Sequence, residues 1–511
     1  MCGKIPDPSR HFGKLQEAVK DLALTSTDSG AIPIMTISEP GIQLIQGASA
    51  SQILYTCLAA AVQAYPEVFK AIQFPKQARD FKRQYAAVLP RFEAARINQP
   101  NRADIARLLA ETFQAHLVYQ SDEGTQSLQD HLATPSQALP LERLPSNCQP
   151  GWQPNLHFLD QDWADLTRLG EALSSKNVIS RDAKTALDWL TQNLDNPQHV
   201  DLSQRKVVIF GASAEMAPTT QFNAAGAEIL WLDLAAPTML AASEHRGGGI
   251  QYVADGVNLL TQPAEILATI LAFAAGEPLD LCLYAYAPGQ AREMRLTAAM
   301  NAIVNALPAP LIRSTTLLLS PTTATPLEVH DLAALTDRKN SRPLWEALLA
   351  RLGLLGRGGG AALQGDQGAS RSVVGIQGAS YQAAQYLAKL MTAETWLQHG
   401  AFPNAKDGPI RVSANTAPIT QTRSIAHPVF DAAFGGAAAL GVRTFTPVQS
   451  QTLNGLLAIQ DWLNPAQPML GKIRVHGGIH TLPYPMDTAL LVAAAIGFIQ
   501  RPKLLAGLFK R

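Results

Sequence analysis

The 511-residue sequence predicts an α/β protein: a doubly wound parallel sheet of about seven strands, preceded by a mainly helical N-terminal region. Three observations lead to this prediction. From residue 206 onward, short apolar segments alternate with helical patterns, which is typical of a parallel sheet covered on both faces. Residues 1 to about 200 instead repeat apolar residues at three- and four-residue intervals, as amphipathic helices do. Charged residues make up only 16% of the chain, which suits a large interior or buried subunit contacts.

The region before residue 200 is predicted to be helical. Two long segments, 50–72 and 102–119, carry apolar residues at helical spacing, and two further helices are expected around 160–172 and 180–194. Between these pairs, the Pro-, Ser- and Gln-rich stretch 133–154 is typical of a connector. No chemical motif stands out in this region. We therefore interpret it as a cap or an oligomerisation arm.

The region from residue 206 onward, within a domain taken as 201–511, is predicted to form the sheet. Its strand candidates are KVVIFGA (206–212), AEILWLDL (227–234), IQYVAD (250–255), LDLCLYAYA (279–287), TTLLLS (315–320), PIRVSANTA (409–417) and GKIRVHGG (471–478). Right-handed crossovers between them place ligands at the carboxyl ends of the strands. The glycine-rich segment 353–370 lacks the GK[ST] ending of a phosphate-binding loop. We expect a mobile loop there, near enough to the site to act as a lid.

Charge and cysteine content weigh against several classes of protein. The 41 basic and 41 acidic residues balance, so bulk charge does not favour a nucleic-acid partner. The four cysteines are scattered without CxxC or Cys/His spacing, which argues against a disulfide framework or a zinc site and favours a reducing cytoplasm. The N-terminus has no apolar stretch of signal-peptide length, and the apolar run 489–499 is too short to span a bilayer. We expect a cytoplasmic protein.

A series of short motifs follows the strands in order. KVVIFGASAEMAP (206–218) takes the first strand directly into Gly211, as a dinucleotide-binding turn requires. The second strand ends at Asp233, 22 residues later, and ADGV (254–257) follows the third. The fourth strand ends in AYAPG (285–289). Each of these fragments is a weak signal alone.

The later motifs are sharper. IRVSANTAPITQT (410–422) and IRVHGG (473–478) complete the series. In this order and spacing, the motifs of residues 206–485 resemble those of the short-chain dehydrogenase/reductase family. The resemblance implies a Rossmann-like fold and a nicotinamide cofactor at the carboxyl edge of the sheet.

The resemblance also implies which residues bind the cofactor. Asp233 would accept hydrogen bonds from the adenosine ribose and clash with a 2′-phosphate, so NAD is preferred over NADP. Asp255 would hold the adenine amino group, and Pro418 and Thr422 would border the nicotinamide. The full set is Gly211, Ser213, Glu215, Met216, Asp233, Asp255, Gly256, Val257, Ala287, Pro418 and Thr422.

The catalytic motif of the family is only partly present. Its Tyr-x-x-x-Lys spacing serves a purpose, because a tyrosine with a pKa near 10 exchanges a proton near neutral pH only if a nearby cation stabilises the phenolate. Here the helix GASYQAAQYLAKLM (378–391) places Gln385 four residues after Tyr381. Lys389 lies two turns from Tyr381, about 12 Å along the helix axis, which is too far for direct contact.

The resemblance nevertheless implies a catalytic set. It consists of Tyr381, Ser320, Lys389, Gln385 and Asn301. Tyr381 would be the acid/base, Ser320 would orient the substrate oxygen, and Gln385 or Lys389 would hold the ribose.

Several alternatives stay open at these positions. Tyr386 forms an i,i+3 pair with Lys389 and competes with Tyr381 for the acid/base role, and the helix is equally compatible with a purely structural amphipathic element. Thr322 is a substitute for Ser320, which alternatively caps a strand-to-loop turn. His476 and His480 flank the last strand but have no evident third ligand, so no metal site is expected.

The orientation of Glu215 decides whether the turn after the first strand can bind the pyrophosphate of a dinucleotide. It stands where such a turn usually has a second glycine that faces the pyrophosphate. A helix after Gly211 would still direct its N–H groups and positive end toward a phosphate. A Glu215 carboxylate turned inward would add negative charge beside that phosphate, whereas one turned to solvent would be harmless.

Two functions follow from these patterns. The first is an NAD(P)-dependent oxidoreductase acting on a carbonyl/alcohol pair of a medium-to-large substrate, with lipid-like substrates among the candidates. The alternative is a catalytically degenerate protein of the same fold that binds a nucleotide or acts as a scaffold, which the missing lysine and altered glycines favour. The C-terminal segment 487–511 ends in a short basic amphipathic tail, so it is a candidate for peripheral membrane contact or for a subunit interface in a homo-oligomer.

Overall fold

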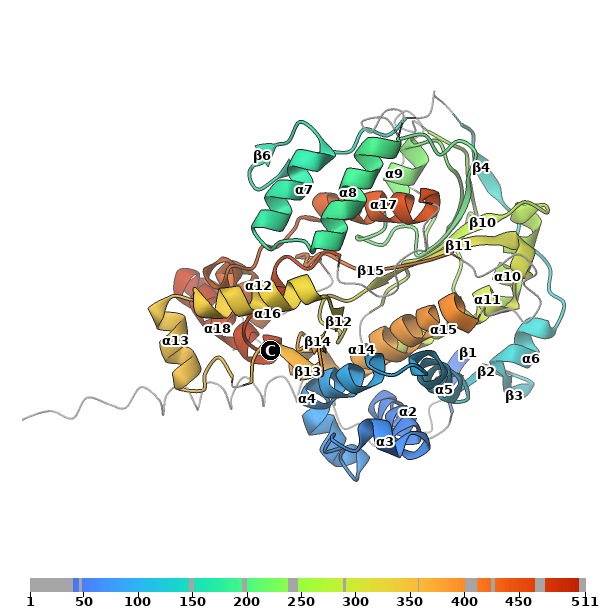
Figure 1. The fold of residues 1–511 in the computed structure, drawn as a ribbon. Coiled ribbons are helices and arrows are strands. Elements are labelled where there is room, and N and C mark those ends of the chain that lie inside the picture. Colours follow the sequence, from blue (N-terminus) through green and yellow to red (C-terminus); the bar gives the residue numbers. More distant parts are fainter. Residues whose placement is uncertain are drawn as a thin grey trace, which may run out of the picture.

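The computed structural model describes residues 40–45, 48–146, 151–194, 200–237, 247–287, 291–356, 358–399, 411–423, 428–464 and 474–504. Its centre is a mostly parallel sheet between two layers of helices, with a further group of helices to one side of the sheet (Figure 1). The protein is therefore a mixed α/β protein, as the sequence predicts.

The central sheet has seven strands in the order β15-β11-β10-β7-β8-β9-β4. Their bounds are β15 (Arg411–Thr416), β11 (Ile312–Leu319), β10 (Leu279–Leu283), β7 (Lys206–Phe210), β8 (Glu228–Leu232), β9 (Ile250–Tyr252) and β4 (Glu142–Leu144). All neighbouring pairs are parallel except β4, which runs antiparallel to β9. Counted along the chain, the six parallel strands lie in the order 3-2-1-4-5-6. The first six predicted strands are confirmed.

The seventh predicted strand is wrong as a member of this sheet. Within its described part, Val475 forms only an isolated antiparallel bridge to Ile179. Residues 471–473 of that prediction lie outside the described residues.

The two helical layers follow from the alternation of side chains along buried strands. In β7, Val207 and Ile209 face one hydrophobic cluster, and Val208 and Phe210 face the other. The first cluster is covered by α7 (Leu166–Ser175), α8 (Arg181–Asn193), α9 (Thr219–Ala224) and α17 (Pro447–Leu463). The second is covered by α2 (Ala50–Ala64), α3 (Pro66–Phe69), α4 (Ala78–Ile97), α5 (Arg102–Gln114), α6 (Leu128–Ala133), α10 (Pro263–Ala274), α11 (Arg292–Ala306), α14 (Gly378–Gln382), the π-helix η3 (Ala383–Met391) and α15 (Thr392–His399).

The described N-terminal region is mainly helical, and its helices lie on both faces of the sheet (Figure 1). It also contributes the strands β1 (Gly41–Leu44), β2 (Leu117–Ser121) and β3 (Gly124–Ser127), which form a separate small sheet, and the hairpin β5 (His157–Phe158) and β6 (Gln161–Asp162). Part of the expected connector 133–154 is β4, the edge strand of the central sheet. Buried charges fix α4 in place, because the Arg96 guanidinium donates to Glu93 and to Glu394 of α15. The N-terminal helices are thus built into the core.

A third hydrophobic cluster lies beyond the end of β11 and β15. The helices around it are α12 (Val329–Asn340), α13 (Leu344–Arg351), α16 (Pro428–Gly436) and α18 (Met486–Gln500), with the 3-10 turns η4 (Ala437–Leu440) and η5 (Ile479–Thr481). Shorter 3-10 turns are η1 (Ala309–Leu311), η2 (Gly375–Gln377) and η6 (Pro502–Leu504). Figure 1 shows this group to the side of the sheet, with α16 and α18 packed together.

The expectation of a mobile loop over 353–370 is wrong. Most of this segment is a hairpin of β13 (Ala361–Gln364) and β14 (Gln367–Ser370), which joins β12 (Pro326–Leu327) in a three-stranded sheet packed on α4. Gly365, with φ of 61°, supplies the left-handed residue that the two-residue turn requires. The glycines therefore serve a turn and close packing, and a lid role has no support in this hairpin.

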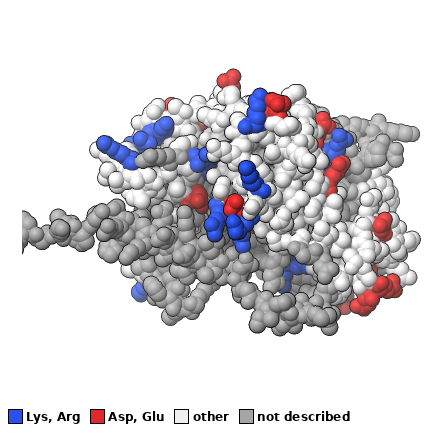
Figure 2. Space-filling view, turned by 90° about the horizontal axis from the view of Figure 1, so that it is seen from below, with Lys and Arg blue, Asp and Glu red and all other residues white. Residues whose placement is uncertain are grey.

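The surface and helix lengths add two observations. On the described part of the face shown in Figure 2, Lys and Arg side chains are few and lie interspersed with Asp and Glu. None of the described helices combines the length and the apolar character needed to cross a membrane. The last part of the C-terminal tail, residues 505–511, lies outside the described residues.

Candidate functional site

A cavity of about 1440 Å³ lies at the carboxyl edge of the parallel strands. Its walls are the turn after β7 (213–216), the ends of β10 and β11, the helices α14 and η3, the loop after β15 (417–423), and the helices α16 and α18. Ligand pockets are commonly about 300–1,000 Å³, so this cavity has room for a large ligand. It contains the predicted residues Ser213, Glu215, Met216, Ser320, Tyr381, Gln385, Lys389, Pro418 and Thr422.

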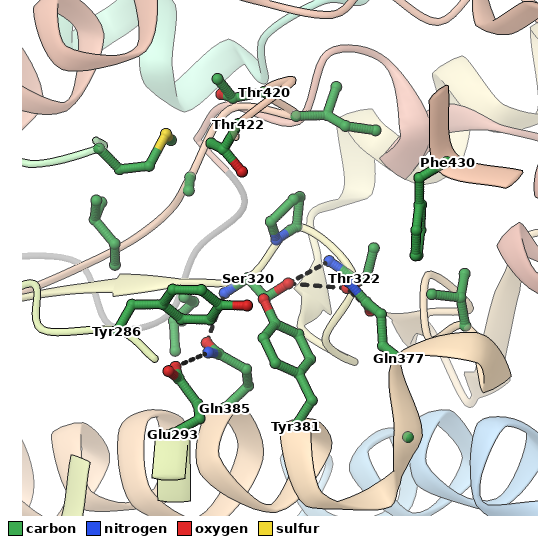
Figure 3. Close-up of a pocket in the computed structure, with 18 of the residues that line it drawn as sticks. Tyr286, Glu293, Ser320, Thr322, Gln377, Tyr381, Gln385, Thr420, Thr422 and Phe430 are labelled. Carbon is green, nitrogen blue, oxygen red and sulfur yellow. Dashed lines mark hydrogen bonds between the residues drawn. The ribbon is translucent and has the colours of Figure 1, made fainter. Parts of the chain in front are cut away.

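Tyr381 and Ser320 meet at the polar end of this cavity. Ser320 follows the last residue of β11, and Tyr381 comes from α14 on the opposite wall; Figure 3 shows the phenol pointing toward Ser320. The Ser320 Oγ lies 2.9 Å from the Thr322 hydroxyl, which in turn donates to the Gln377 side chain. The ring of Tyr286 packs edge-on against Tyr381, with centroids 6.5 Å apart. Several hydroxyl groups therefore converge on one point of the cavity.

Gln385 connects this point to a buried acid. Its Oε1 accepts the backbone N–H of Ser320 at 2.9 Å, and its Nε2 donates to Glu293 at 2.9 Å. The Lys389 ammonium lies 3.4 Å from the same Glu293 oxygen, and the backbone N–H of Ala287 donates to the other. Gln385 therefore holds Ser320 in place, while the charge of Lys389 is balanced by Glu293.

The electrostatics of the polar end keep its tyrosines protonated. Burial, followed by the negative charge of Glu293, raises the pKa of Tyr381 above its ordinary value, and the Ser320 hydroxyl opposes this only in part. The same two causes raise the pKa of Tyr286 to about 12. Burial also raises the pKa of Glu293, against the opposing effect of Lys389. The hydroxyl groups of both tyrosines are consequently hydrogen-bond donors at neutral pH.

The turn after β7 has the glycine that the sequence predicts. Gly211 has φ of 76°, and a Cβ at this position would lie 2.4 Å from the Cα of Ala285. Only glycine allows the first strand to pass this close to the end of β10.

The helix expected directly after Gly211 starts later. The backbone N–H of Ala214 donates to the Gly211 carbonyl, and the N–H of Ala217 donates to the Ala214 carbonyl. These two successive turns delay α9 to Thr219, whose side chain is buried, and α9 has only six residues. The N–H groups of Ala214 and Ala217 are therefore used within the turn itself.

Glu215 faces the cavity. Its carboxylate accepts the backbone N–H of Arg423 at 3.0 Å and lies 3.7 Å from the Arg423 guanidinium, and its backbone carbonyl accepts from Gln451. The Glu215 side chain is 22% exposed. It thus joins the turn after β7 to the loop after β15, across the mouth of the cavity.

Asp233 is bonded to the same turn. One carboxylate oxygen accepts both the backbone N–H of Ser213 at 2.7 Å and the Ser213 hydroxyl at 2.8 Å, and the other accepts the N–H of Leu234. The backbone N–H of Val257 donates to the Asp233 carbonyl at 2.6 Å, and Gly256 packs against the carbonyl of Leu234. Asp233, Asp255, Gly256, Val257 and Ala287 lie outside the described lining of the cavity.

Other predicted residues lie away from the cavity. The Asn301 side chain is buried and donates to the carbonyl of Ala388 in η3, so it joins two helices instead of reaching the cavity. Tyr386 is fully buried on the opposite face of η3, where its hydroxyl donates to Glu93 at 2.6 Å. Tyr386 therefore lies away from the cavity that Tyr381 lines, and this geometry gives its acid/base alternative no support.

The two histidines near the last predicted strand form a buried pair. Their rings pack edge-on with centroids 5.2 Å apart. Burial lowers the pKa of both, and that of His480 falls to about 3, so neither ring carries a charge at neutral pH. Within the described ranges, His, Cys, Asp and Glu side chains form no group of three that could hold a metal ion.

The sequence interpretation missed Glu293, Tyr286 and Gln377. Tyr286 lies in the quoted AYAPG motif, and Glu293 stands seven residues after it. An acidic residue early in a buried helix was the available signal for Glu293, because buried carboxylates are rare unless they are paired. No known family model matches the chain, and the curated proteins include no similar sequence.

Proposed function

We propose that this protein has a short-chain dehydrogenase/reductase-like, Rossmann-like fold that binds a ligand through a carbonyl or hydroxyl oxygen and has lost its dinucleotide site. The strand order 3-2-1-4-5-6 supports the fold, because it is the order of doubly wound dinucleotide-binding proteins. The main support for the loss of the dinucleotide site is the position of Glu215, whose side chain points into the cavity mouth and bonds to Arg423.

A dinucleotide fits poorly to the residues present. Its pyrophosphate normally accepts backbone N–H groups at the start of a helix. Here the N–H groups of Ser213, Ala214 and Ala217 are bonded to other protein atoms, and Glu215 adds a negative charge beside them. The Asp233 carboxylate already accepts three hydrogen bonds from the protein, which leaves it little capacity for ribose hydroxyl groups. These contacts support the degenerate alternative over a cofactor-dependent enzyme.

The polar end of the cavity supports ligand binding. Tyr381 is a protonated donor, and the hydroxyl groups of Ser320 and Thr322 lie beside it. A carbonyl or hydroxyl oxygen placed beside Ser320 and Tyr381 would accept hydrogen bonds from both hydroxyl groups. Each neutral hydrogen bond contributes about 0.5–1.5 kcal/mol, so two would orient the ligand without dominating its affinity.

Calorimetric titration with NADH and NADPH tests the loss of the dinucleotide site. We expect no binding to the purified protein at about 1 mM of either nucleotide, which corresponds to a binding free energy weaker than roughly −4 kcal/mol. A Kd in the micromolar range for either nucleotide would contradict the proposal.

A second candidate is a reductase that acts on a carbonyl group, for which a reduced nicotinamide cofactor would supply the hydride. The specific observation in its favour is the Ser320–Tyr381 pair, which is the arrangement the family resemblance implies. A tyrosine with a raised pKa is a poor base, but it still protonates an alkoxide, which is far more basic than a phenolate. The site would therefore favour reduction over oxidation. Loss of turnover in Tyr381→Phe, with turnover kept in Tyr386→Phe, would support this candidate.

A further inference from the structure

The cavity has a second, apolar part. We call it the apolar arm: the part lined by α16, η4 and α18, which includes Phe430, Ala433, Ala437, Ala489, Leu490 and Ala493. Among the described residues, every side chain that α16, η4 and α18 contribute to this lining is uncharged. The loop residue Ile419 and Val374 also line the cavity. Figure 3 shows Phe430 across the cavity from Tyr381.

The arm has a packed wall on its far side. A Cβ on Gly436 would lie 2.0 Å from the Ala493 carbonyl oxygen, and one on Gly497 would lie 1.8 Å from that of Ala432. These two glycines therefore bring α16 and α18 into backbone contact. Because their backbones are already in contact, α16 and α18 cannot move closer together to close the arm. Four alanines, Ala433, Ala437, Ala489 and Ala493, line the arm, so much of its wall is made of short side chains.

From this geometry we propose that the apolar arm binds an unbranched alkyl or acyl chain whose head oxygen lies at Ser320 and Tyr381. The proposal rests on the ligand-binding function proposed above and names its ligand class. A chain is favoured because one end of the cavity offers hydroxyl donors, whereas the arm offers only apolar contacts to the rest of the ligand. The small side chains of Ala433, Ala437, Ala489 and Ala493 suit a narrow chain better than a ring system.

Titration calorimetry with 1-alkanols of six, eight, ten and twelve carbons, without nucleotide, tests the arm. Each added methylene that enters the arm should strengthen binding by about fourfold, from about 0.8 kcal/mol per buried CH₂. Ala489→Phe should fill the arm, so that affinity no longer rises with chain length. Ile499→Phe is the matched control, because Ile499 lies on the same helix α18 but is 81% exposed, and it should keep the wild-type dependence.

The head and the arm give separate readouts. Tyr381→Phe should weaken all four alkanols by a similar factor and leave the increment per methylene unchanged, whereas Ala489→Phe should abolish the increment. If Tyr381→Phe has no effect and the increment persists, the proposed head site fails and the arm stands. Affinity that is independent of chain length in the wild type, or an increment unchanged by Ala489→Phe, would overturn the arm. If Ala489→Phe does not fold, Ala489→Leu provides the same test, and it should reduce the affinity increment per methylene by a smaller amount.

Discussion

Removing Glu215 should restore affinity for a dinucleotide. The Glu215 carboxylate is held by the backbone N–H of Arg423 and by a guanidinium whose side chain is 93% exposed. An exposed ion pair contributes only about 0–1 kcal/mol, so Glu215→Gly should leave the fold intact. The substitution removes one negative charge from the cavity mouth. Two charges about 5 Å apart repel each other by roughly 1–3 kcal/mol at effective dielectric constants between about 80 and 20.

This repulsion corresponds to a change in Kd of about 5- to 150-fold. NADH titration, followed by calorimetry, should therefore detect binding to Glu215→Gly where the wild type shows none, and Glu215→Gln should give a similar gain. Glu171→Gln is the control, because it removes the same charge from an exposed position on α7. Equal NADH affinity in the wild type and both Glu215 variants would refute the argument that this carboxylate blocks the site.

Three further predictions concern stability. Gly211→Ala should lower the free energy of unfolding by about 2–5 kcal/mol, because left-handed backbone strain adds to a clash with the end of β10; an unchanged urea midpoint would contradict this. Arg96→Leu should lower the free energy of urea unfolding by about 3–5 kcal/mol, since it leaves Glu93 buried without its cation and Glu394 with Arg102 alone, and a loss below about 1 kcal/mol would count against it. Burial raises the pKa of Asp331 to about 7, so the folded state binds this proton more tightly than the unfolded state. Its stabilising effect is complete below about pH 4 and is lost as the pH rises through 7, and the wild type should lose about 2–3 kcal/mol between pH 5 and 7.5 that Asp331→Asn does not lose.

The sheet was predictable because its signals are local. Each parallel strand is a short apolar segment buried on both faces, and the prediction needed only neighbouring residues to find β7, β8 and β10. The turn at Gly211 was predictable for the same reason, since a strand that ends in glycine requires a conformation other residues avoid. Both features are set within a few residues of chain.

The orientation of Glu215 was not predictable, because its partner Arg423 lies 208 residues away along the chain. The hairpin in 353–370 was missed for a related reason. Its strands are short and rich in glycine, and their packing against α4 is a tertiary contact that no local pattern encodes. The apolar arm likewise depends on how α16 and α18 pack, although each helix alone looks like ordinary core.

Gln385 fixes the position of Ser320 at the polar end of the cavity but supplies no positive charge to Tyr381. In the implied family motif a lysine here would supply a positive charge near Tyr381. Gln385 instead bridges the N–H of Ser320 and the Glu293 carboxylate, so the serine stays in place. Lys389, which lines the same cavity, is paired with Glu293, and the net effect of burial and this acid is to raise the pKa of Tyr381. A site arranged in this way donates hydrogen bonds to a ligand oxygen, but it does not stabilise the phenolate that alcohol oxidation requires.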